Sequence, residues 1–366
     1  MKNNSIKNPM RKIKTQLIFT FFIFTFLTNL YAASIQCVWT GIEKIVAIGD
    51  IHGDYKNFVK ILKGIKLINE ELHWTGGKTH LVQTGDIMDR GPDAKKVFDL
   101  LIRLEKEAEE AGGKVHVLIG NHEEMNITGI AFDYVGYVTV DQFVSFLPDK
   151  YREKREKEFR ERIGQKALKE TDPDISLNIN LEEFWREIMR NDGGARRKYI
   201  NTFNEKYGIW ILKHNAVIKI NDIVFAHGGI SEEFSKWKLE DINNLLRKEL
   251  NFLRRAGRRS QPPKIPFKPE IVFDSNGPLW YRELAQKDED VLKKEIGRIL
   301  SNLDAKYMVI AHTPKRGKGV SMKDMRRFQG RIWIIDTGIS DAYGGNLSAL
   351  IIENGKFSVW GVNDEK

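Results

Sequence analysis

The sequence KIVAIGDIHGD, at residues 44–54, decides the fold. Its first half is a short apolar run rich in β-branched residues, and its second half gathers glycine, aspartate and histidine. An apolar run of this length that ends at glycine is typical of a buried strand. Polar residues directly after such a strand lie where layered α/β proteins bind ligands. The stretch therefore predicts a buried strand with a ligand site at its end.

The same pattern returns five times along the chain. The further runs are HLVQT before Gly85-Asp86, VHVLI before Gly120-Asn121, DIVFA before His227, YMVIA before His312 and RIWII before Asp336. Amphipathic stretches with helical spacing lie between several of them, such as residues 58–67 and 94–111. Alternating strands and helices predict a layered α/β fold. We expect the polar residues at the six strand ends to converge on one site.

The pattern stops between Asn126 and Ile209. Residues 151–162 (YREKREKEFRER) carry ten charges in twelve positions, which is typical of a solvated helix with ion pairs between neighbouring turns. We therefore expect residues 126–208 to form a mostly helical insertion that covers one side of the site.

Composition limits the class of protein. The chain has 366 residues, of which 41% are hydrophobic and 30% charged, and this excludes a globally disordered chain. A single cysteine, Cys37, excludes an internal disulfide framework, a cysteine zinc site and an iron–sulfur protein. We expect Cys37 to be an incidental exposed thiol.

The N-terminus indicates export. Residues 1–16 are basic, residues 17–30 are largely apolar, and two alanines follow, which is the order of a secretory signal peptide. We expect removal of residues 1–33 and a periplasmic or secreted mature domain of residues 34–366. The alternative is an uncleaved membrane anchor, although an apolar run of roughly 14 residues is short for a span of about 20.

The formal net charge of +9 is weak grounds for nucleic acid binding, because five of the basic residues lie in the leader. Basic residues gather again at residues 247–270, together with four prolines and without clear periodicity. This favours a basic surface loop. It is either a solvated excursion or an electrostatic collar for anionic substrates.

The polar residues at the strand ends suit a pair of metal ions. The candidate ligands are Asp50, His52, Asp86, Asn121, His227 and His312. Asp50 and His52 are two positions apart on an extended segment, so both side chains can point toward one ion. Asp86 can bridge that ion and a second one. Asn121, His227 and His312 would complete the ligands of the second ion.

The donor types limit the metals. Mixed nitrogen and oxygen donors without thiolate suit Mn²⁺, Zn²⁺ or Fe and do not favour an all-oxygen Ca²⁺ or Mg²⁺ cage. Two such ions about 3.5–4 Å apart can clamp a phosphoester and lower the pKa of a bridging water. Four histidines stand outside the pattern and receive no role: His73, His80, His116 and His214.

Three glycine-led motifs, at residues 49–54, 85–91 and 120–123, together resemble the signature of the PPP-type metallophosphatases, within the calcineurin-like phosphoesterase superfamily. The later Ala226–Gly229 and Ala311–Pro314 are similar to its two histidine motifs. The segments most similar to the Shewanella-like bacterial protein phosphatases are Gly277–Arg282, Asp336-Thr337-Gly338 and Tyr343-Gly344-Gly345. The Ser-Ala-Pro-Asn-Tyr loop of eukaryotic serine/threonine phosphatases is absent.

The resemblance implies a β-sandwich flanked by helices and a centre with two divalent ions, manganese first among the candidates. Asp50, His52 and Asp86 would hold one ion, and Asp86, Asn121, His227 and His312 the other. Attack on phosphorus by metal-bound hydroxide would need no nucleophilic side chain.

The resemblance also implies roles for residues around the ions. His122 would protonate the leaving group as general acid, and Asp89 would orient that imidazole. Arg90 would bind phosphate oxygens, together with Asn121. Arg282 is a second candidate for substrate binding, with a surface ion pair as its alternative.

These inferences favour an exported phosphatase that acts on phosphoserine, phosphothreonine or phosphotyrosine in proteins or peptides. We expect no nucleic acid partner, and membrane contact only through the export signal. One alternative is a hydrolase of dinucleoside polyphosphates or other small phosphoesters, because that group shares the core signature. A non-catalytic binding protein would be expected to have lost metal ligands, whereas all six candidate positions are intact here.

Overall fold

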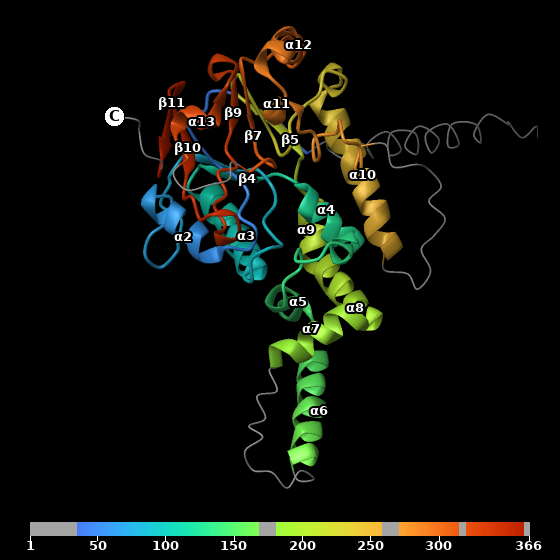
Figure 1. Cartoon of the computed structure of the whole chain (residues 1–366). Coiled ribbons are helices and arrows are strands. Elements are labelled where there is room, and N and C mark those ends of the chain that lie inside the picture. The colour runs from blue at the N-terminus through green and yellow to red at the C-terminus, as the bar shows by residue number, and fades with distance from the viewer. Residues whose placement is uncertain (1–34, 168–180, 258–270, 315–319, 362–366) are drawn as a thin grey trace, which may run out of the picture. The chain divides into compact units, whose positions relative to one another are not determined.

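The computed structural model describes residues 35–167, 181–257, 271–314 and 320–361 (Figure 1). The chain divides into two units, Met1–Gln36 and Cys37–Lys366, and the following description concerns the second. The leader of residues 1–33 lies outside the described residues, so its removal stays a prediction. Within the described ranges, no helix combines the length and apolar character needed to cross a membrane.

Two mixed sheets form the centre of the second unit (Figure 1). The strands are β1 (Val38–Trp39), β2 (Lys44–Ile48), β3 (His80–Gln83), β4 (Lys114–Val117), β5 (Val217–Ile220), β6 (Ile223–Ala226), β7 (Tyr307–Ile310), β8 (Arg326–Arg327), β9 (Ile332–Ile334), β10 (Ala349–Glu353) and β11 (Lys356–Trp360). One sheet has the order β1-β5-β6-β7-β9-β8 and the other β11-β10-β2-β3-β4. The predicted α/β sandwich is confirmed, and each of the six apolar runs forms a strand.

Strand direction explains why the motifs meet. In one sheet β2, β3 and β4 are parallel neighbours, with Ile45 opposite His80 and His80 opposite Lys114. In the other sheet β6, β7 and β9 are parallel neighbours. Because parallel strands end at the same edge of a sheet, the residues that follow each group of three come together.

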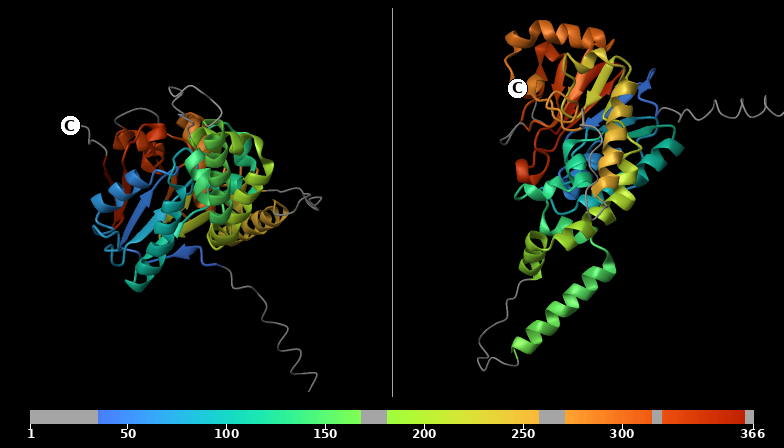
Figure 2. Two further views of the ribbon diagram at one scale, coloured as in Figure 1. Left: turned by 90° about the horizontal axis from the view of Figure 1, so that it is seen from below. Right: turned by 90° about the vertical axis from the view of Figure 1, so that its right-hand side faces the viewer.

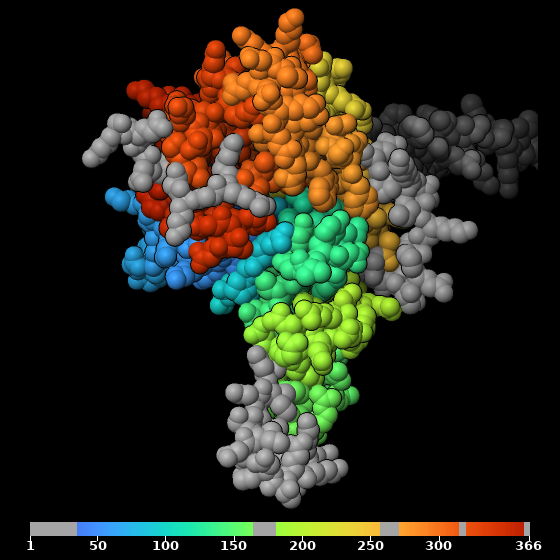
Figure 3. Space-filling model, viewed as in Figure 1, coloured from blue at the N-terminus to red at the C-terminus, as the bar shows by residue number. Residues whose placement is uncertain are grey.

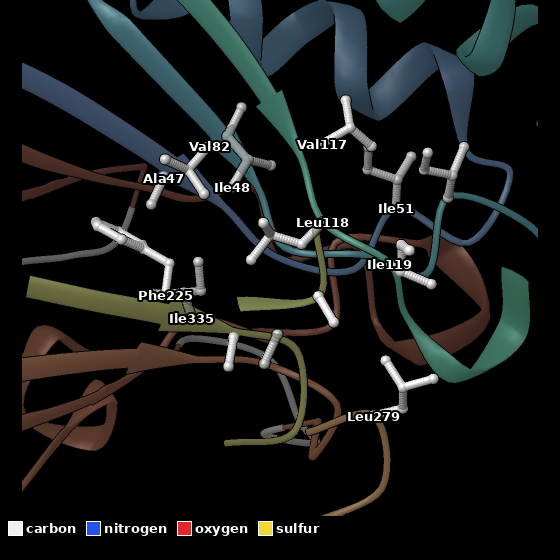
Figure 4. Packing of buried hydrophobic residues seen from close by; sticks show 14 of the residues in the cluster. Ala47, Ile48, Ile51, Val82, Val117, Leu118, Ile119, Phe225, Leu279 and Ile335 are labelled. Carbon is white, nitrogen blue, oxygen red and sulfur yellow. The ribbon is translucent and has the colours of Figure 1, made fainter. Parts of the chain in front are cut away.

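The apolar faces of the sheets pack against each other. Figure 4 shows side chains of Ala47, Ile48 and Val82 from one sheet close to those of Phe225 and Ile335 from the other, and all five are at most 1% exposed. Burying one such large side chain contributes roughly 1.5–3 kcal/mol. The strand ends therefore project from a well-packed core, which fixes their positions.

Helices flank both sheets. They are α2 (Tyr55–Gly64), α3 (Ala94–Glu110), α10 (Leu239–Gly257), α11 (Glu283–Gln286), α12 (Glu289–Asn302) and α13 (Met322–Met325). The helix expected at residues 58–67 begins three residues earlier, because the Asp54 side chain caps it and accepts a hydrogen bond from the Asn57 backbone N–H at 2.9 Å.

Helices α4 (Asn121–Thr128), α5 (Val140–Phe146), α6 (Asp149–Ala167), α7 (Leu181–Asn191), α8 (Gly193–Phe203) and α9 (Ile209–Ile211) follow one another without a strand in the part of residues 121–211 that the structure describes. Helix α4 contacts α8 and α10, and the right-hand view in Figure 2 shows the bright-green helix α6 extending away from α10. The charged stretch 151–162 lies within α6, as expected for a solvated helix. The exact boundaries 126–208 of an insertion stay a prediction.

The expectation of an exposed Cys37 is wrong. Cys37 is 2% exposed, because the chain enters the sheet here: the Lys219 N–H donates to its carbonyl oxygen at 2.8 Å. Burial and the neighbouring Glu240 raise the pKa of the thiol to about 11. Cys37 is therefore an inert part of the core.

The expectation of a basic loop at residues 247–270 is wrong for its first part, because α10 continues to Gly257. This helix buries a stripe of apolar residues with helical spacing: Leu239, Ile242, Leu246, Leu250 and Leu253. Because the stripe begins at Leu239, before residue 247, its helical spacing cannot be recognised from residues 247–270 alone. Residues 258–270 lie outside the described ranges.

Two histidines without an expected role form a buried pair. His116 Nε2 lies 3.0 Å from His80 Nδ1. Burial lowers the pKa of His80 to about 4, and burial and His80 hold the pKa of His116 well below its ordinary value. The folded state therefore keeps this pair neutral at a pH where the unfolded chain protonates both residues.

The pair predicts a loss of stability in mild acid. Below the ordinary histidine pKa of about 6.5 the unfolded state binds more protons, so the free energy of unfolding falls as the pH drops toward 4. Urea unfolding of metal-free protein at several pH values should show this fall. A His80→Gln/His116→Gln double variant should show a shallower one, whereas His73→Gln, with a side chain 59% exposed, should match the unchanged protein. An equal slope in all three proteins would contradict the assignment.

Candidate metal centre

The six predicted ligands lie in one buried cluster. Asp50, His52, Asp86, Asn121, His227 and His312 are each at most 5% exposed. The Asp86 carboxylate is at the centre, since its Oδ2 lies 3.3 Å from His227 Nε2 and 3.9 Å from His52 Nε2. Asp86 belongs to two groups whose ligand atoms lie within 4.8 Å of one another, one with His52 and His122, the other with His227 and His312. This geometry fits a carboxylate shared by two ions.

The second group is the tighter one. His227 Nε2 lies 2.9 Å from Asn121 Oδ1 and 3.1 Å from His312 Nδ1. On its other side the His227 ring places Nδ1 2.9 Å from the Thr84 carbonyl oxygen. A proton on Nδ1 donates to that carbonyl and leaves the Nε2 lone pair facing the cluster, which is the usual arrangement of a metal-binding histidine.

The first group is arranged in the same way. His52 Nδ1 lies 3.1 Å from the Met88 carbonyl oxygen, so its Nε2 faces the cluster. Asp50 lies between the groups, 3.9 Å from His52 Nε2 and 3.7 Å from His227 Nδ1. Burial lowers the pKa of His52 to about 4, and burial and His227 hold the pKa of His312 well below its ordinary value. Both rings are therefore neutral, which is the form that binds metal.

Unpartnered buried atoms indicate that cations fit here. Asp50 Oδ1 and His312 Nε2 are buried without a hydrogen-bond partner among the described residues, and such an atom costs about 1–3 kcal/mol. Asp336, for which no role was predicted, adds a third carboxyl group beside Asp50 and Asp86. Burial raises the pKa of Asp336 to about 6, and burial and Asp336 together raise that of Asp50 well above its ordinary value. Divalent cations would stabilise this concentration of carboxylates.

The backbone of the site is strained. Five residues other than glycine have φ between 48° and 69°: His52, Asp86, Asp89, Arg90 and His312. Each such conformation costs on the order of 1–3 kcal/mol and persists where the surrounding structure enforces it, which is common at functional sites.

Glu123 is part of the support that sequence reasoning missed. Its carboxylate accepts hydrogen bonds from the backbone N–H groups of Asp86 and Ile87, both at 2.8 Å, and from that of Gly120 at 2.9 Å. A Cβ atom at Gly120 would lie 2.3 Å from Asp86 Oδ1, so only glycine allows this approach. The glutamate three residues after Gly120 is the available sequence signal, since it has the spacing of a helix-capping box.

His122 is held as a proton donor. Its Nδ1 lies 2.7 Å from Asp89 Oδ2, and its Nε2 faces the cluster, 3.8 Å from Asp86 Oδ2. Burial lowers the pKa of His122, but the carboxylates of Asp86 and Asp89 outweigh burial and raise it to about 9. A protonated imidazole has no lone pair for a metal. This separates His122 from the ligands, although it lies within reach of them.

Side chains outside the motifs, on helices α4, α5 and α8, hold Asp89 in place. The Asp89 carboxylate accepts hydrogen bonds from Asn126 Nδ2 at 2.9 Å and Gln142 Nε2 at 2.7 Å. The Tyr199 hydroxyl lies between these amides, donating to Asn126 Oδ1 at 2.7 Å and accepting from Gln142 Nε2 at 2.9 Å. Helices α4, α5 and α8 therefore fix the partner of the proton donor, a role beyond covering the site.

Arg90 lines a cavity beside the cluster, since the Tyr343 ring in the same wall is 5.0 Å from the His52 ring, and we call this cavity the entrance. The guanidinium carbon of Arg90 is 3.9 Å from the centre of the Tyr137 ring and 5.8 Å from that of Tyr343. Arg90 and Tyr343 line this cavity of about 480 Å³ together with Gly136, Ala342 and Gly344. Arginine at this entrance has the charge and the donor geometry to bind phosphate oxygens.

Arg282 lies beside a predicted ligand. Its Nη1 donates to the His312 carbonyl oxygen at 2.7 Å and to Thr313 Oγ1 at 3.3 Å. It has no ion pair with any residue that the structure describes, contrary to the surface-pair alternative. The contact with the His312 backbone indicates that Arg282 positions this ligand, and substrate binding by Arg282 stays a prediction.

Comparison with known proteins shows which family this chain is similar to. The model of the calcineurin-like phosphoesterase family matches residues 43–316. An uncharacterized protein of Schizosaccharomyces pombe is 32% identical over 84% of this chain and 76% of its own length. Shewanella-like protein phosphatase 1 of Plasmodium berghei is 28% identical over 82% of this chain and 68% of its own. The crystal structure of a cold-active protein-tyrosine phosphatase from a Shewanella species covers 91% of this chain and 82% of its own, with a TM-score of 0.58 and 25% identity.

Proposed function

The chain belongs to the calcineurin-like phosphoesterase family, and we propose that it is a metal-dependent phosphatase that removes phosphate from phosphoserine, phosphothreonine or phosphotyrosine in proteins. The observation that carries this proposal is the His122–Asp89 pair beside two ligand groups that share Asp86. The relatives named as protein phosphatases support the class of substrate.

The six ligands would bind two divalent ions. Asp50, His52 and Asp86 would hold one divalent ion, and Asp86, Asn121, His227 and His312 a second. Two ions bound there would polarise the phosphate and activate a water molecule for attack on phosphorus. We propose manganese first, with zinc or iron as the other candidates, because the donors are nitrogen and oxygen without thiolate.

The remaining residues act on the substrate. Arg90 binds phosphate oxygens at the entrance, and His122 transfers the proton on Nε2 to the departing oxygen of serine, threonine or tyrosine. Cations near Asp86 would offset the effect of that carboxylate on the pKa of His122. Asp89 is therefore the partner that keeps the imidazole protonated, and its hydrogen bond at 2.7 Å also fixes the direction of Nε2.

Metal dependence is directly measurable. Metal-reconstituted protein should contain two equivalents of divalent metal by elemental analysis, and a chelator should abolish turnover of p-nitrophenyl phosphate, with recovery on adding Mn²⁺. The reason is that the carboxylates and imidazoles of the centre are grouped as metal ligands, so attack on phosphorus would depend on water activated by the bound ions. Full turnover by protein shown to be metal-free would contradict this mechanism.

The class of substrate needs a separate comparison. Reconstituted protein should hydrolyse phosphopeptides with a kcat/KM well above that for diadenosine tetraphosphate. The reverse order would favour the small-molecule alternative while leaving the metal centre and His122 in their proposed roles.

A further inference from the structure

A second cavity, of about 590 Å³, lies between residues 131–141 and helices α7 and α8. Its lining mixes apolar side chains, such as Phe132, Val135 and Met189, with arginines and with the carboxylates of Asp141 and Glu182. Figure 3 shows the green-to-teal surface of the first segment directly against the yellow-green surface of the two helices. None of these residues takes part in the metal centre.

The cavity is connected to the catalytic residues through aromatic rings. Tyr134 in its wall stacks on Tyr137 with 4.9 Å between ring centres, and Tyr137 stacks on His122 with 4.8 Å. Gly136 lines both this cavity and the entrance beside Arg90. The second cavity therefore lies next to the first. The ring of Tyr134 in its wall is at most about 10 Å from the His122 ring, a distance that about three residues of extended peptide span.

The apolar part of the cavity is unusually open to solvent. Val135 is 97% exposed and Tyr134 is 48% exposed. Apolar side chains gathered at the rim of a cavity are typical of a surface that a partner covers. The size and the apolar lining suit a short peptide segment that carries a large aliphatic or aromatic side chain.

The basic part of the cavity carries charge without a counterion. Arg186 is paired with Glu182 and Glu183. In contrast, Arg190 and Arg196 have no carboxylate partner among the residues that the structure describes. Arg196 donates to the Met189 carbonyl oxygen at 2.5 Å, whereas Arg190 is exposed. Asp141 adds one carboxylate to the same lining. The two arginines outnumber it, and the resulting net positive charge favours an acidic side chain on the bound partner.

We propose that this cavity binds the part of a substrate protein next to the phosphorylated residue. It takes an apolar side chain about three positions away, with an acidic residue beside it that pairs with Arg190. This inference rests on the proposed protein phosphatase function and adds a sequence preference to it. The substrate chain would cross from the entrance at Arg90 past Gly136 into the cavity.

A charge reversal tests the preference. Two kinds of phosphoserine peptide are compared, with Leu-Glu or Leu-Lys at the third and fourth positions from the phosphoserine, on either side of it. The kcat/KM of each peptide is expressed relative to that of p-nitrophenyl phosphate. Arg190→Glu should lower the relative kcat/KM for the better Leu-Glu peptide about tenfold and raise it for the Leu-Lys peptide. Arg197→Glu, an exposed position of α8 that does not line the cavity, is the matched control and should change neither.

Replacement of an apolar residue at the rim tests the preference for an apolar side chain. Val135→Ser should lower the relative kcat/KM for the Leu-Glu peptide several-fold, whereas Val291→Ser, 69% exposed on α12, should not. Equal turnover of both peptides by all variants would overturn the cavity inference and leave the proposed function intact. Turnover of p-nitrophenyl phosphate without turnover of any phosphopeptide would overturn the proposed function, and the inference with it.

Discussion

Replacing His122 with asparagine is expected to lower kcat for a phosphoserine peptide by about 10²–10⁴-fold while both metal ions stay bound. The loss corresponds to about 3–5 kcal/mol of activation free energy, because the serine alkoxide would have to leave without a proton. Elemental analysis of the variant checks the metal content, and steady-state kinetics checks kcat. His227→Asn or His312→Asn should instead lower the metal content, since each removes an imidazole of the second ligand group.

The leaving group sharpens this test. p-Nitrophenol is acidic enough to depart without much protonation, so His122→Asn should lose less activity on p-nitrophenyl phosphate than on the phosphoserine peptide. Asp89→Asn should show the same order in milder form. It weakens the partner that orients His122 at 2.7 Å and keeps it protonated, but it leaves the imidazole in place. Loss of metal from His122→Asn would show that His122 is a ligand, and equal losses on the two substrates would show that it is not the general acid.

The predictable part of the fold is the part encoded in short stretches. Each of the six apolar runs that ends at glycine or at a polar residue forms a strand, and the strands within each group of three are parallel. Strand direction alone brings Asp50 and Asp86 to one edge of the first sheet, and His227 and His312 to one edge of the second. The packing of the two sheets against each other then joins the two sets of ligands, and this step is not encoded in the short stretches.

The support around the site was not predictable in this way. Gln142 and Tyr199 hold Asp89 from helices that are 53 and 110 residues further along the chain. Neither residue stands in a motif, and an isolated glutamine or tyrosine on a helix has no signal that distinguishes a buried network from an exposed face. Long-range hydrogen bonds of this kind depend on how whole elements pack, which local patterns do not encode.

The errors at Cys37 and α10 have a common origin. The structure joins them, because Cys37 lies beside Glu240 of α10 and beside Arg247. The side chain of Arg247 donates to Asn215 Oδ1 and the His214 carbonyl oxygen, so this basic residue is part of the packing. Composition assigned Cys37 and Arg247 to the surface, whereas the added strand β1 and the apolar stripe of α10 bury the region between them.

Asp86→Asn is expected to have the largest effect on the centre: loss of both metal ions and of all metal-dependent activity. The substitution keeps the shape of the side chain but removes the negative charge that both ligand groups share. The amide oxygen can still accept the His122 backbone N–H, which donates to Asp86 Oδ1 at 3.0 Å, so the variant should fold.

The matched control for Asp86→Asn is Asp54→Asn, the same exchange in the first motif. Asp54 caps α2 and accepts the Asp341 N–H at 2.9 Å, and asparagine caps a helix about as well as aspartate. Asp54→Asn should therefore keep two equivalents of metal. Elemental analysis and calorimetric titration with Mn²⁺ measure both variants, and circular dichroism checks their folding. If folded Asp86→Asn keeps one ion, Asp86 serves a single site; if it binds two with unchanged affinity, Asp86 is no ligand, and the carboxylates of Asp50 and Asp336 would have to hold the first ion.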